Sequence, residues 1–335
     1  MQTLSEQFTF RPATLDDVKP VVDLLNACAV AQTGKPQVDV GEIRTDWRQP
    51  TFNLETDTLV VFASDGKLVG YAALWDSAPH VRIFVAGDVH PEYKGRGIGT
   101  SLCRWAEERG RQAVLESPAG ARVVLVQERL STHEAARSLL CEQGCRPARH
   151  SLRMVIEMDG PPLEPIAPDG IIIRPFRRGE EERAVIQAVR EAFTDHWGYV
   201  ERPFEEEYKE WTYFLNNDPN SDPSLWFVAA DGDEIAATSL CHPTLVEDPE
   251  MGWVFGLSVR RSWRRRGIAL ALLHHSFGEF YRRGKRKVGL GVDAQSLTGA
   301  TRLYKKAGMH VERQYVIYEK ELRPGRDLST QSVEN

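Results

Sequence analysis

The sequence has few cysteines, no long apolar run and no excess of positive charge, and each shortage excludes a class of protein. The five cysteines among 335 residues are too few and too scattered for a disulfide framework, and they fit a reducing cytoplasmic location. No apolar run reaches the roughly 18 residues that a membrane-spanning helix needs. A net charge of −6 argues against a general nucleic-acid binder. We therefore expect a cytoplasmic protein that binds neither membranes nor nucleic acid.

Several motifs of hydrolases and metal sites are missing as well. The sequence contains neither Gly-x-Ser-x-Gly nor His-Glu-x-x-His, the signatures of serine hydrolases and zinc proteases. Cys141 and Cys145 have no second Cys or His pair nearby at the spacing of a zinc site. We therefore expect no metal.

The most informative segment runs from residue 252 to residue 308. An apolar run, GWVFGLSV, predicts a strand over residues 252–259, and a turn over residues 264–269 leads into a helix. Backbone N–H groups at the start of a helix have no intrahelical partner, and the helix dipole adds partial positive charge there. Gly267 lets a ligand approach the backbone closely. The turn can therefore bind a pyrophosphate.

This segment resembles the coenzyme A site of GNAT superfamily acetyltransferases. The pattern Arg-x-x-Gly-x-Ala follows a strand and opens a helix, as in the pyrophosphate turn of that family. Tyr304 lies 37 residues after Gly267, at the position of the family's general acid. The resemblance implies acetyl-CoA as cofactor and Tyr304 as the catalytic acid. The implied cofactor-binding residues of the turn are Arg264, Arg265, Arg266, Gly267, Ile268 and Ala269.

The strand before the turn is also expected to contact the cofactor. A backbone N–H at Leu257, Ser258 or Val259 would polarise the thioester carbonyl and stabilise negative charge on its oxygen.

The chain contains an internal repeat. Gly97 and Gly267 lie 170 residues apart, and Gly144 and Gly308 lie 164 apart. A near-constant offset with a matching order of elements indicates two copies of one unit. We predict an α/β (α+β) fold with two tandem GNAT-like domains, each a mixed, mostly antiparallel sheet flanked by helices. This resembles the tandem GNAT arrangement of mycothiol synthase.

The repeat and the composition place the predicted domain boundaries. The first domain would cover residues 1–158 and the second residues 171–323. Between them, DGPPLEPIAPDG over residues 159–170 holds four prolines and reads as a semi-rigid linker. The polar residues 324–335 are expected to form a disordered tail.

The two copies are not chemically equivalent. Alignment of Gly144 with Gly308 places Leu140 opposite Tyr304, so the first copy lacks the phenol. We therefore expect catalysis in the second copy only. The first copy keeps a phosphate-binding turn, and its expected cofactor-binding residues are Val89, Lys94, Gly95, Arg96, Gly97, Ile98 and Gly99.

The general base is less well defined than the acid. Glu250 comes directly before the 252–259 strand, where enzymes of this family often place a base, and is the candidate. Glu247, Asp248 and His242 are alternatives from the same stretch. The aromatic segment from residue 196 to residue 214 would line an acceptor pocket or pack between the domains.

These observations predict an acetyl-CoA-dependent N-acetyltransferase. The acceptor would be a primary amine of a small molecule or peptide, and the protein a monomer or homodimer. The alternative is a non-catalytic acyl-CoA-binding or protein-interaction module that uses the same fold.

Overall fold

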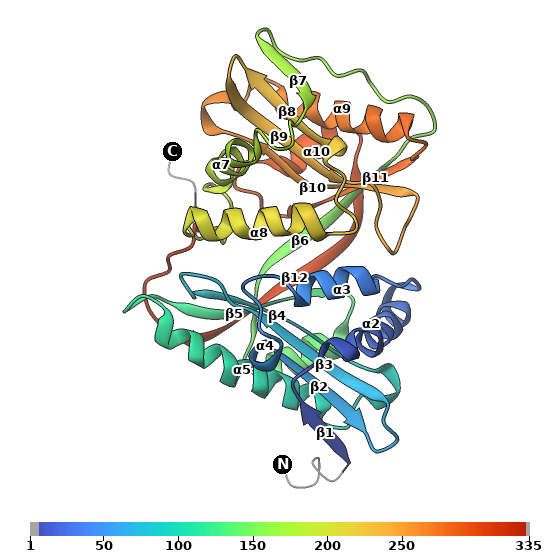
Figure 1. Ribbon diagram of the computed structural model, residues 1–335, viewed down its shortest axis with the longest axis vertical. Helices are drawn as coiled ribbons and strands as arrows, with labels where there is room; N and C mark the ends of the chain where they lie inside the picture. Colours follow the sequence, from blue (N-terminus) through green and yellow to red (C-terminus); the bar gives the residue numbers. More distant parts are fainter. Residues whose placement is uncertain (1–6, 333–335) are drawn as a thin grey trace. The chain divides into compact units, whose positions relative to one another are not determined.

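The computed structural model describes residues 7–332 and divides the chain into two compact units, each built from two segments. The N-terminal unit consists of the described residues up to 149 together with residues 315–328. The C-terminal unit consists of residues 150–314 together with the residues from 329 onward. Each unit contains a mixed, mostly antiparallel sheet with helices on both faces (Figure 1). The predicted fold class is therefore confirmed.

The sheet of the N-terminal unit has the strand order β1-β2-β3-β4-β5-β12. Only β4 and β5 run parallel, while the other neighbours that have a recorded register are antiparallel. Its elements in chain order are β1 (Phe8–Arg11), η1 (Leu15–Asp17), α2 (Val18–Thr33), α3 (Val40–Trp47), α4 (Leu54–Asp57), β2 (Thr58–Ala63), β3 (Leu68–Trp75), β4 (Arg82–Val89), η2 (Pro91–Tyr93), α5 (Ile98–Glu116), β5 (Val123–Leu130), α6 (Glu134–Glu142) and the larger part of β12 (His310–Arg323).

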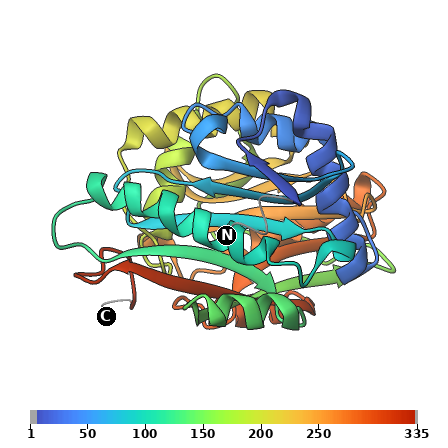
Figure 2. The same ribbon diagram turned by 90° about the horizontal axis from the view of Figure 1, so that it is seen from below.

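Helices cover both faces of the N-terminal sheet because its strands alternate apolar side chains toward each face. Helices α2 and α3 pack on one face, where their apolar residues meet Tyr71 and Ala73 of β3. Helix α5 packs on the other face, against Ala72 and Leu74 of the same strand. Figure 2 shows α2 and α3 in blue on one side of this sheet and α5 in teal on the other.

The sheet of the C-terminal unit has the order β6-β11-β10-β9-β8-β7, and only β10 and β11 run parallel. Its elements are most of β6 (Arg146–Glu157), β7 (Ile171–Pro175), α7 (Glu182–Phe193), α8 (Phe204–Asn217), η3 (Pro223–Leu225), β8 (Trp226–Asp231), β9 (Glu234–His242), β10 (Met251–Val259), η4 (Arg261–Trp263), α9 (Ile268–Arg282), β11 (Lys287–Asp293) and α10 (Ala300–Lys306). Helix α7 packs on one face of the sheet, and α9 packs on the other.

Each unit includes a strand from the other half of the sequence. Residues of β6 pair with β11 in the C-terminal unit, and β12 pairs with β5 in the N-terminal unit. Residues 150–158 and 315–323 thus lie in the opposite units from those that the domain boundaries assumed. A buried ion pair of 2.7 Å between Arg82 and Glu319 attaches β12 to the N-terminal unit. Local sequence patterns do not specify such distant strand pairing.

The predicted linker has no regular secondary structure, whereas the predicted tail is attached to the rest of the chain. Residues 159–170 contain neither helix nor strand. The described part of the expected tail, residues 324–332, is attached by backbone hydrogen bonds rather than free. Arg326 exchanges hydrogen bonds with Gly120 and Arg122, and Thr330 does so with Gly198 and Tyr199. Residues 333–335 lie outside the described part of the chain.

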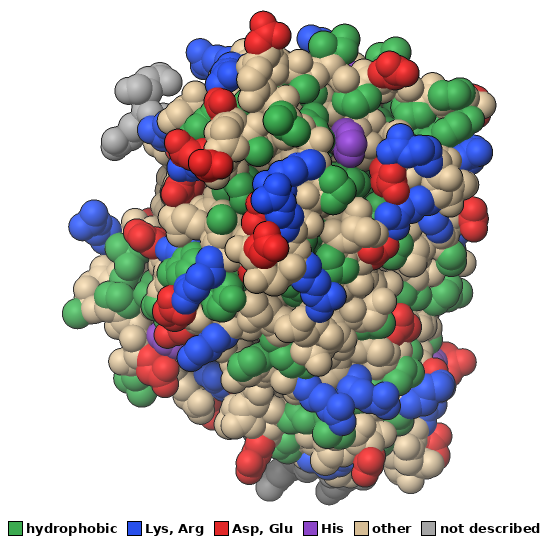
Figure 3. Space-filling model, turned by 45° about the horizontal axis from the view of Figure 1, so that its top comes forward, with side chains coloured by type: hydrophobic (Ala, Val, Ile, Leu, Met, Phe, Trp, Pro, Cys, Tyr) green, Lys and Arg blue, Asp and Glu red, His purple; other side chains and the backbone are tan. Residues whose placement is uncertain are grey.

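Charged side chains of both signs are interspersed over the face shown in Figure 3. The basic residues at the end of α9 illustrate this, since Arg282 pairs with Glu279 at 2.6 Å and Arg283 with Asp222 at 2.7 Å. No helix among residues 7–332 is long and apolar enough to cross a membrane.

Candidate active site

The parallel strands β10 and β11 separate part-way along the C-terminal sheet. They are paired from Met251 with Lys287 to Val254 with Leu290, and the pairing ends there. Beyond that point β10 still pairs with β9, and β11 with β6. A gap therefore opens between two strand edges whose backbone groups need hydrogen-bond partners. An extended ligand that carries amide groups can supply those partners.

The gap begins at a β-bulge in β10. Val254 pairs with Cys241 and Gly256 pairs with Leu240, so Phe255 is an extra residue without a partner in β9. A bulge of this kind leaves one residue unpaired and redirects the strand. The corresponding strand β4 of the N-terminal unit has no bulge, because it pairs with β3 without a shift from Gly70–Val89 to Trp75–Phe84.

The direction of the backbone N–H groups follows from strand alternation. The N–H of Arg260 donates to the carbonyl of Ala236 in β9 at 3.0 Å. Because successive residues of a strand point their N–H groups to opposite sides, that of Ser258 also faces β9. The N–H groups of Leu257 and Val259 then face the gap. Of the three residues predicted to polarise the carbonyl, Leu257 and Val259 therefore present an N–H to the gap, whereas Ser258 does not.

The predicted turn lies at the end of the gap and opens helix α9. Gly267 adopts φ = 89°, a left-handed conformation that favours glycine. Apart from Gly267 and its two neighbours in the chain, no atom of residues 7–332 lies within 4 Å of the place where a Cβ on Gly267 would stand, so the approach to the backbone is open. Within residues 7–332 no side chain caps this helix start. The N–H groups of Ile268 and Ala269 therefore remain available to an anion, which fits a pyrophosphate.

The three arginines of the turn have different roles. Arg264 donates to the carbonyls of Val259 at 3.1 Å and Ala192 at 2.9 Å, and it also pairs with buried Asp195. Its side chain therefore anchors the turn to α7 and is not free for phosphate, contrary to the expectation. Arg266 is exposed and lies 3.4 Å from Asp231. Arg265 makes no hydrogen bond or ion pair within the described chain and can reach a phosphate.

Tyr304 lies on α10 and is only 7% exposed. It belongs to the hydrophobic cluster that also contains Val254 and Leu290, the last paired residues before the gap. Burial raises the pKa of Tyr304 to about 12. The phenol is therefore protonated at neutral pH, as a general acid requires.

A cavity of about 590 Å³ reaches the bulge from the α7 and α8 side of the sheet. Aromatic side chains line much of it, including Trp211 of α8 and Trp226 of β8. The expectation that the aromatic segment lines a pocket agrees with Tyr199, Trp211 and Phe214, which all line this cavity. Its charged lining residues are Arg190, Glu207, Glu210 and Asp218.

His242 lines this cavity beside the bulge. Its ring lies 4.4 Å from the ring of Phe255, and its Nε2 lies 3.9 Å from Asp218. Burial lowers the pKa of His242, while Asp218 opposes that shift. The imidazole is therefore neutral at pH 7 and can accept a proton.

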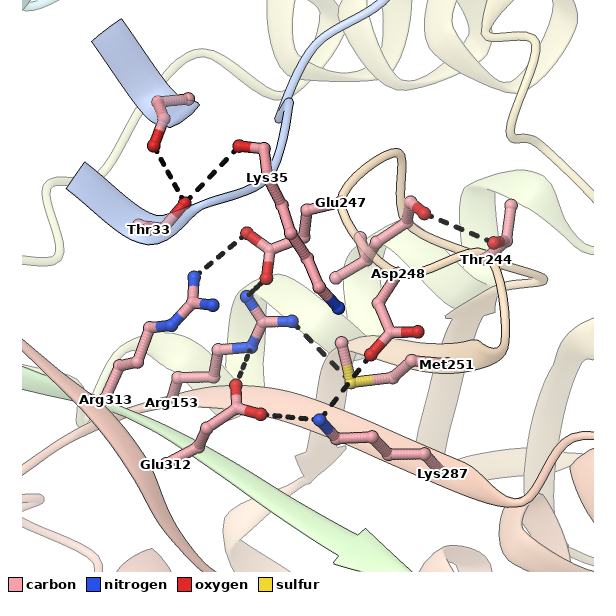
Figure 4. Close-up of polar contacts among 12 residues, drawn as sticks. Thr33, Lys35, Arg153, Thr244, Glu247, Asp248, Met251, Lys287, Glu312 and Arg313 are labelled. Carbon is pink, nitrogen blue, oxygen red and sulfur yellow. Dashed lines mark hydrogen bonds and ion pairs between the residues drawn. The ribbon is translucent and has the colours of Figure 1, made fainter. Parts of the chain in front are cut away.

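The other three candidate bases lie elsewhere. Glu250 is exposed and precedes β10, at the end of that strand opposite to the gap. Glu247 lies between Arg153 at 2.5 Å and Arg313 at 3.1 Å, and Asp248 pairs with Lys287 at 3.6 Å. Figure 4 shows this network, in which Arg153 and Lys287 also hold Glu312. Both carboxylates are therefore held in ion pairs, and neither lines the cavity at the bulge.

The N-terminal unit has its own cavity, of about 490 Å³, at the equivalent turn. Strands β4 and β5 separate there too, after Phe84 and Val126. Leu140 lines the cavity where the second unit has Tyr304. The predicted residues that line it are Val89, Lys94, Gly95, Gly97, Ile98 and Gly99. Arg96 does not line it, because its side chain lies over the ring of Tyr93 and donates to the carbonyl of Glu92.

The profile of the Acetyltransferase (GNAT) family matches this chain twice, over residues 19–139 and 186–309. The chain belongs to the GNAT family. It is accordingly an acetyltransferase with two GNAT domains, and members of this fold take their acyl group from a coenzyme A thioester.

Proteins similar to this GNAT acetyltransferase include mycothiol acetyltransferases. That of Geodermatophilus obscurus is 28% identical over 300 residues, covering 87% of this chain and 90% of that protein. That of Salinispora arenicola is 29% identical over 271 residues, covering 78% and 81%. A solved GCN5-related N-acetyltransferase from Sphaerobacter thermophilus is 39% identical with a TM-score of 0.78, covering 97% and 98% of the two chains.

A tandem GNAT protein from the clavulanic acid biosynthesis pathway shares the fold with a TM-score of 0.68. It is 17% identical and covers 95% of this chain and 100% of that one. The predicted tandem arrangement is therefore confirmed.

Proposed function

We propose that this protein transfers an acetyl group from acetyl-CoA to a primary amine of a small molecule, and that the reaction takes place in the C-terminal unit. The observation that carries the proposal is the acceptor-side cavity that reaches the β10 bulge at Phe255 and Gly256. The mycothiol acetyltransferases among the relatives support a small-molecule amine as acceptor.

The residues of the gap and the turn would hold the donor. When bound, acetyl-CoA supplies an activated carbonyl and a thiolate leaving group. The N–H groups at the start of α9 and the Arg265 guanidinium would bind its phosphates. The N–H of Leu257 or Val259 would stabilise the negative charge that develops on the carbonyl oxygen.

The acceptor amine must lose a proton before it can react. A primary amine with a pKa of about 10 is almost entirely ammonium at pH 7, and freeing its lone pair costs about 4 to 5 kcal/mol. Asp218 gives the cavity a carboxylate that would attract an ammonium group, whereas Glu207 is paired with Arg190 at 3.3 Å. We propose His242, rather than Glu250, as the group that accepts the proton, because it is neutral and lies beside the bulge.

Tyr304 would return a proton to the departing sulfur. A free thiol has a pKa of about 8.5, well below that of the buried phenol, so the transfer would be unfavourable in water. Burial raises thiol pKa values too, as it does for Cys241 of the same unit, to about 12. Burial beside Tyr304 would likewise raise the pKa of the coenzyme thiol and so lower the cost of proton transfer between them.

The experiment that tests the reaction is an amine screen with the purified protein and acetyl-CoA, read as release of free thiol. Calorimetry with acetyl-CoA is run in parallel. The proposal expects both binding and thiol release with at least one small primary amine. Tight binding without transfer to any amine would favour the non-catalytic acyl-CoA-binding alternative, and absence of binding would contradict both.

A matched pair of variants tests which unit reacts. Gly267→Glu places a carboxylate at the phosphate turn of the C-terminal unit and should abolish turnover by steric block and charge repulsion. Gly97→Glu makes the same change in the N-terminal turn, where φ is 83°, and should leave most turnover intact. The reverse result, in protein that remains folded by circular dichroism, would place the reaction in the N-terminal unit.

A further inference from the structure

The N-terminal unit contains a second cavity that the proposed reaction does not use. It has a volume of about 350 Å³ and lies under helices α2 and α3. The cavity at the phosphate turn lies on the other side of β4 and β5. Ala86, Asp88 and Arg129 line both cavities, so the two spaces adjoin at these residues.

Asp88 presents an unpaired carboxylate to this second cavity. It lies opposite Tyr71 in the β3–β4 ladder, and cross-strand partners share a face of the sheet. Tyr71 packs with α2 and α3, so Asp88 points to the same side. Asp88 is partly exposed, and desolvation raises its pKa although Arg129, His133 and Lys94 act in the opposite direction. Across residues 7–332 its carboxylate accepts no hydrogen bond and forms no ion pair within 4 Å.

The nearest cation does not satisfy this carboxylate. The Arg129 guanidinium donates instead to the carbonyls of Gly87 at 2.8 Å and Glu128 at 3.0 Å. The repeat offset places Ser258 at the equivalent position of the C-terminal unit, where its hydroxyl is hydrogen-bonded to Thr238 at 2.8 Å. A small, uncharged polar residue can thus occupy this strand position. The fold therefore does not require an aspartate at this position.

The rest of the cavity lining suits a cation. Trp47, Tyr71 and Trp75 line it, and the Trp47 indole N–H donates to the Tyr71 hydroxyl at 2.9 Å. Aromatic rings attract cations through their electron-rich faces. Asp46, Glu128 and Arg129 also line the cavity.

We propose that this cavity of the N-terminal unit binds a small molecule with a primary ammonium group, held by Asp88. The ammonium group donates hydrogen bonds to the carboxylate and neutralises it, and the apolar body of the ligand packs against the tryptophans. The site binds its ligand without acetylating it, because Leu140 and an unbulged β4 replace the acid and the bulge of the C-terminal unit. The proposal does not depend on the reaction proposed for that unit.

The experiment is isothermal titration of the full-length protein at low salt with phenethylamine, an ammonium on an apolar ring. Its neutral counterpart 2-phenylethanol is the ligand control. We expect the protein to bind the amine but not the alcohol. Asp88→Asn should lower the affinity for the amine by at least about tenfold, because it removes a charge-assisted hydrogen bond. The matched protein control is Asp218→Asn, which changes only the acidic cavity of the C-terminal unit and should retain the Asp88-dependent binding.

Three results would overturn the proposal. They are equal binding of amine and alcohol, unchanged amine binding by Asp88→Asn, and loss of all amine binding in Asp218→Asn. Absence of amine binding by the unaltered protein counts against it in the same way. Thermal unfolding completes the test, since removal of an unpaired and partly desolvated carboxylate should leave the melting temperature unchanged or raise it. If Asp88→Asn and Asp88→Ser both unfold the protein, Asp88 is structural and the proposal fails.

Discussion

Tyr304 and His242 lie in surroundings that shift their pKa values in opposite directions. Burial disfavours the charged form of each side chain, so it raises the pKa of the phenol and lowers that of the imidazole. At pH 7 the tyrosine therefore holds a proton to donate, and the histidine has a lone pair to accept one. The same physical effect leaves each side chain in the protonation state that its proposed role requires.

Replacement of Tyr304 by phenylalanine removes the proton donor while keeping the ring. We expect kcat to fall by roughly 10- to 1,000-fold, in the range of general acid contributions. In the unaltered enzyme, ionisation of Tyr304 should cause no loss of rate below about pH 10, because its pKa is about 12. Steady-state rates over pH 6 to 10 test both statements, and an unchanged rate in the variant at every pH would remove Tyr304 from the mechanism.

Replacement of His242 by glutamine removes the proposed base. We expect kcat/KM at pH 7 to fall by about 100-fold or more. Because burial lowers the pKa of His242, the unaltered enzyme should lose activity only as the pH falls below 6.5, through that lowered value. The variant should lack this acid limb in its pH–rate profile.

Glu250→Gln is the matched control for this experiment. Glu250 is exposed and lies at the far end of β10, so the substitution should leave the rate close to that of the unaltered enzyme. A large loss in Glu250→Gln together with an active His242→Gln would restore the assignment of Glu250 as the base.

At the scale of elements, the close contact of β10 with α9 supports the phosphate turn between them. A Cβ on Gly252 would lie 2.4 Å from the ring of Phe280, which is fully buried. The absence of a side chain at this position lets α9 pack directly on the strand. The helix start at Gly267 is thereby held next to the gap.

Gly252→Ala should therefore destabilise the protein. Overpacking of a rigid core costs about 1 to 3 kcal/mol, which urea denaturation monitored by circular dichroism can measure. Gly256→Ala in the same strand is the control, since its Cβ would meet Leu240 at 3.7 Å, an ordinary contact distance. Equal stability of the two variants would show that α9 can move away from β10 at little cost.

At the scale of the whole molecule, each unit depends on a strand from the other half of the sequence. Glu319 of β12 pairs with Arg82 at 2.7 Å and with Arg122 at 3.0 Å in the N-terminal unit. The side chains of Arg82 and Glu319 are 8% and 9% exposed. Separation of the two halves would leave Arg82 without its carboxylate.

We therefore expect residues 1–158 and residues 159–335 not to fold as separate fragments. Breaking a buried ion pair by removal of one partner costs about 3 to 5 kcal/mol, and loss of β12 also leaves the edge of β5 unpaired. Circular dichroism and size-exclusion chromatography of each fragment test this, with co-expression of both as the control that should restore a folded complex. Cooperative thermal unfolding of the isolated 1–158 fragment would contradict the prediction.

The sequence alone determined the features that depend on spacing along the chain. The repeat offsets, the phosphate turn at Gly267 and the contrast between Tyr304 and Leu140 follow from local hydrogen-bond geometry and helix periodicity. The fold class and the family could be predicted from these features. The exchange of β6 and β12 could not, because pairing between distant strands has no local signature.

Only the tertiary structure decided which polar groups are free to act. The arginines of the turn look alike in sequence, yet Arg264 anchors the turn to α7 while Arg265 has no partner among residues 7–332. Glu247 and Asp248 are held by cations, whereas His242 lies at the bulge in a cavity. The availability of a charge depends on its neighbours in space, and residues distant in sequence supply most of those neighbours.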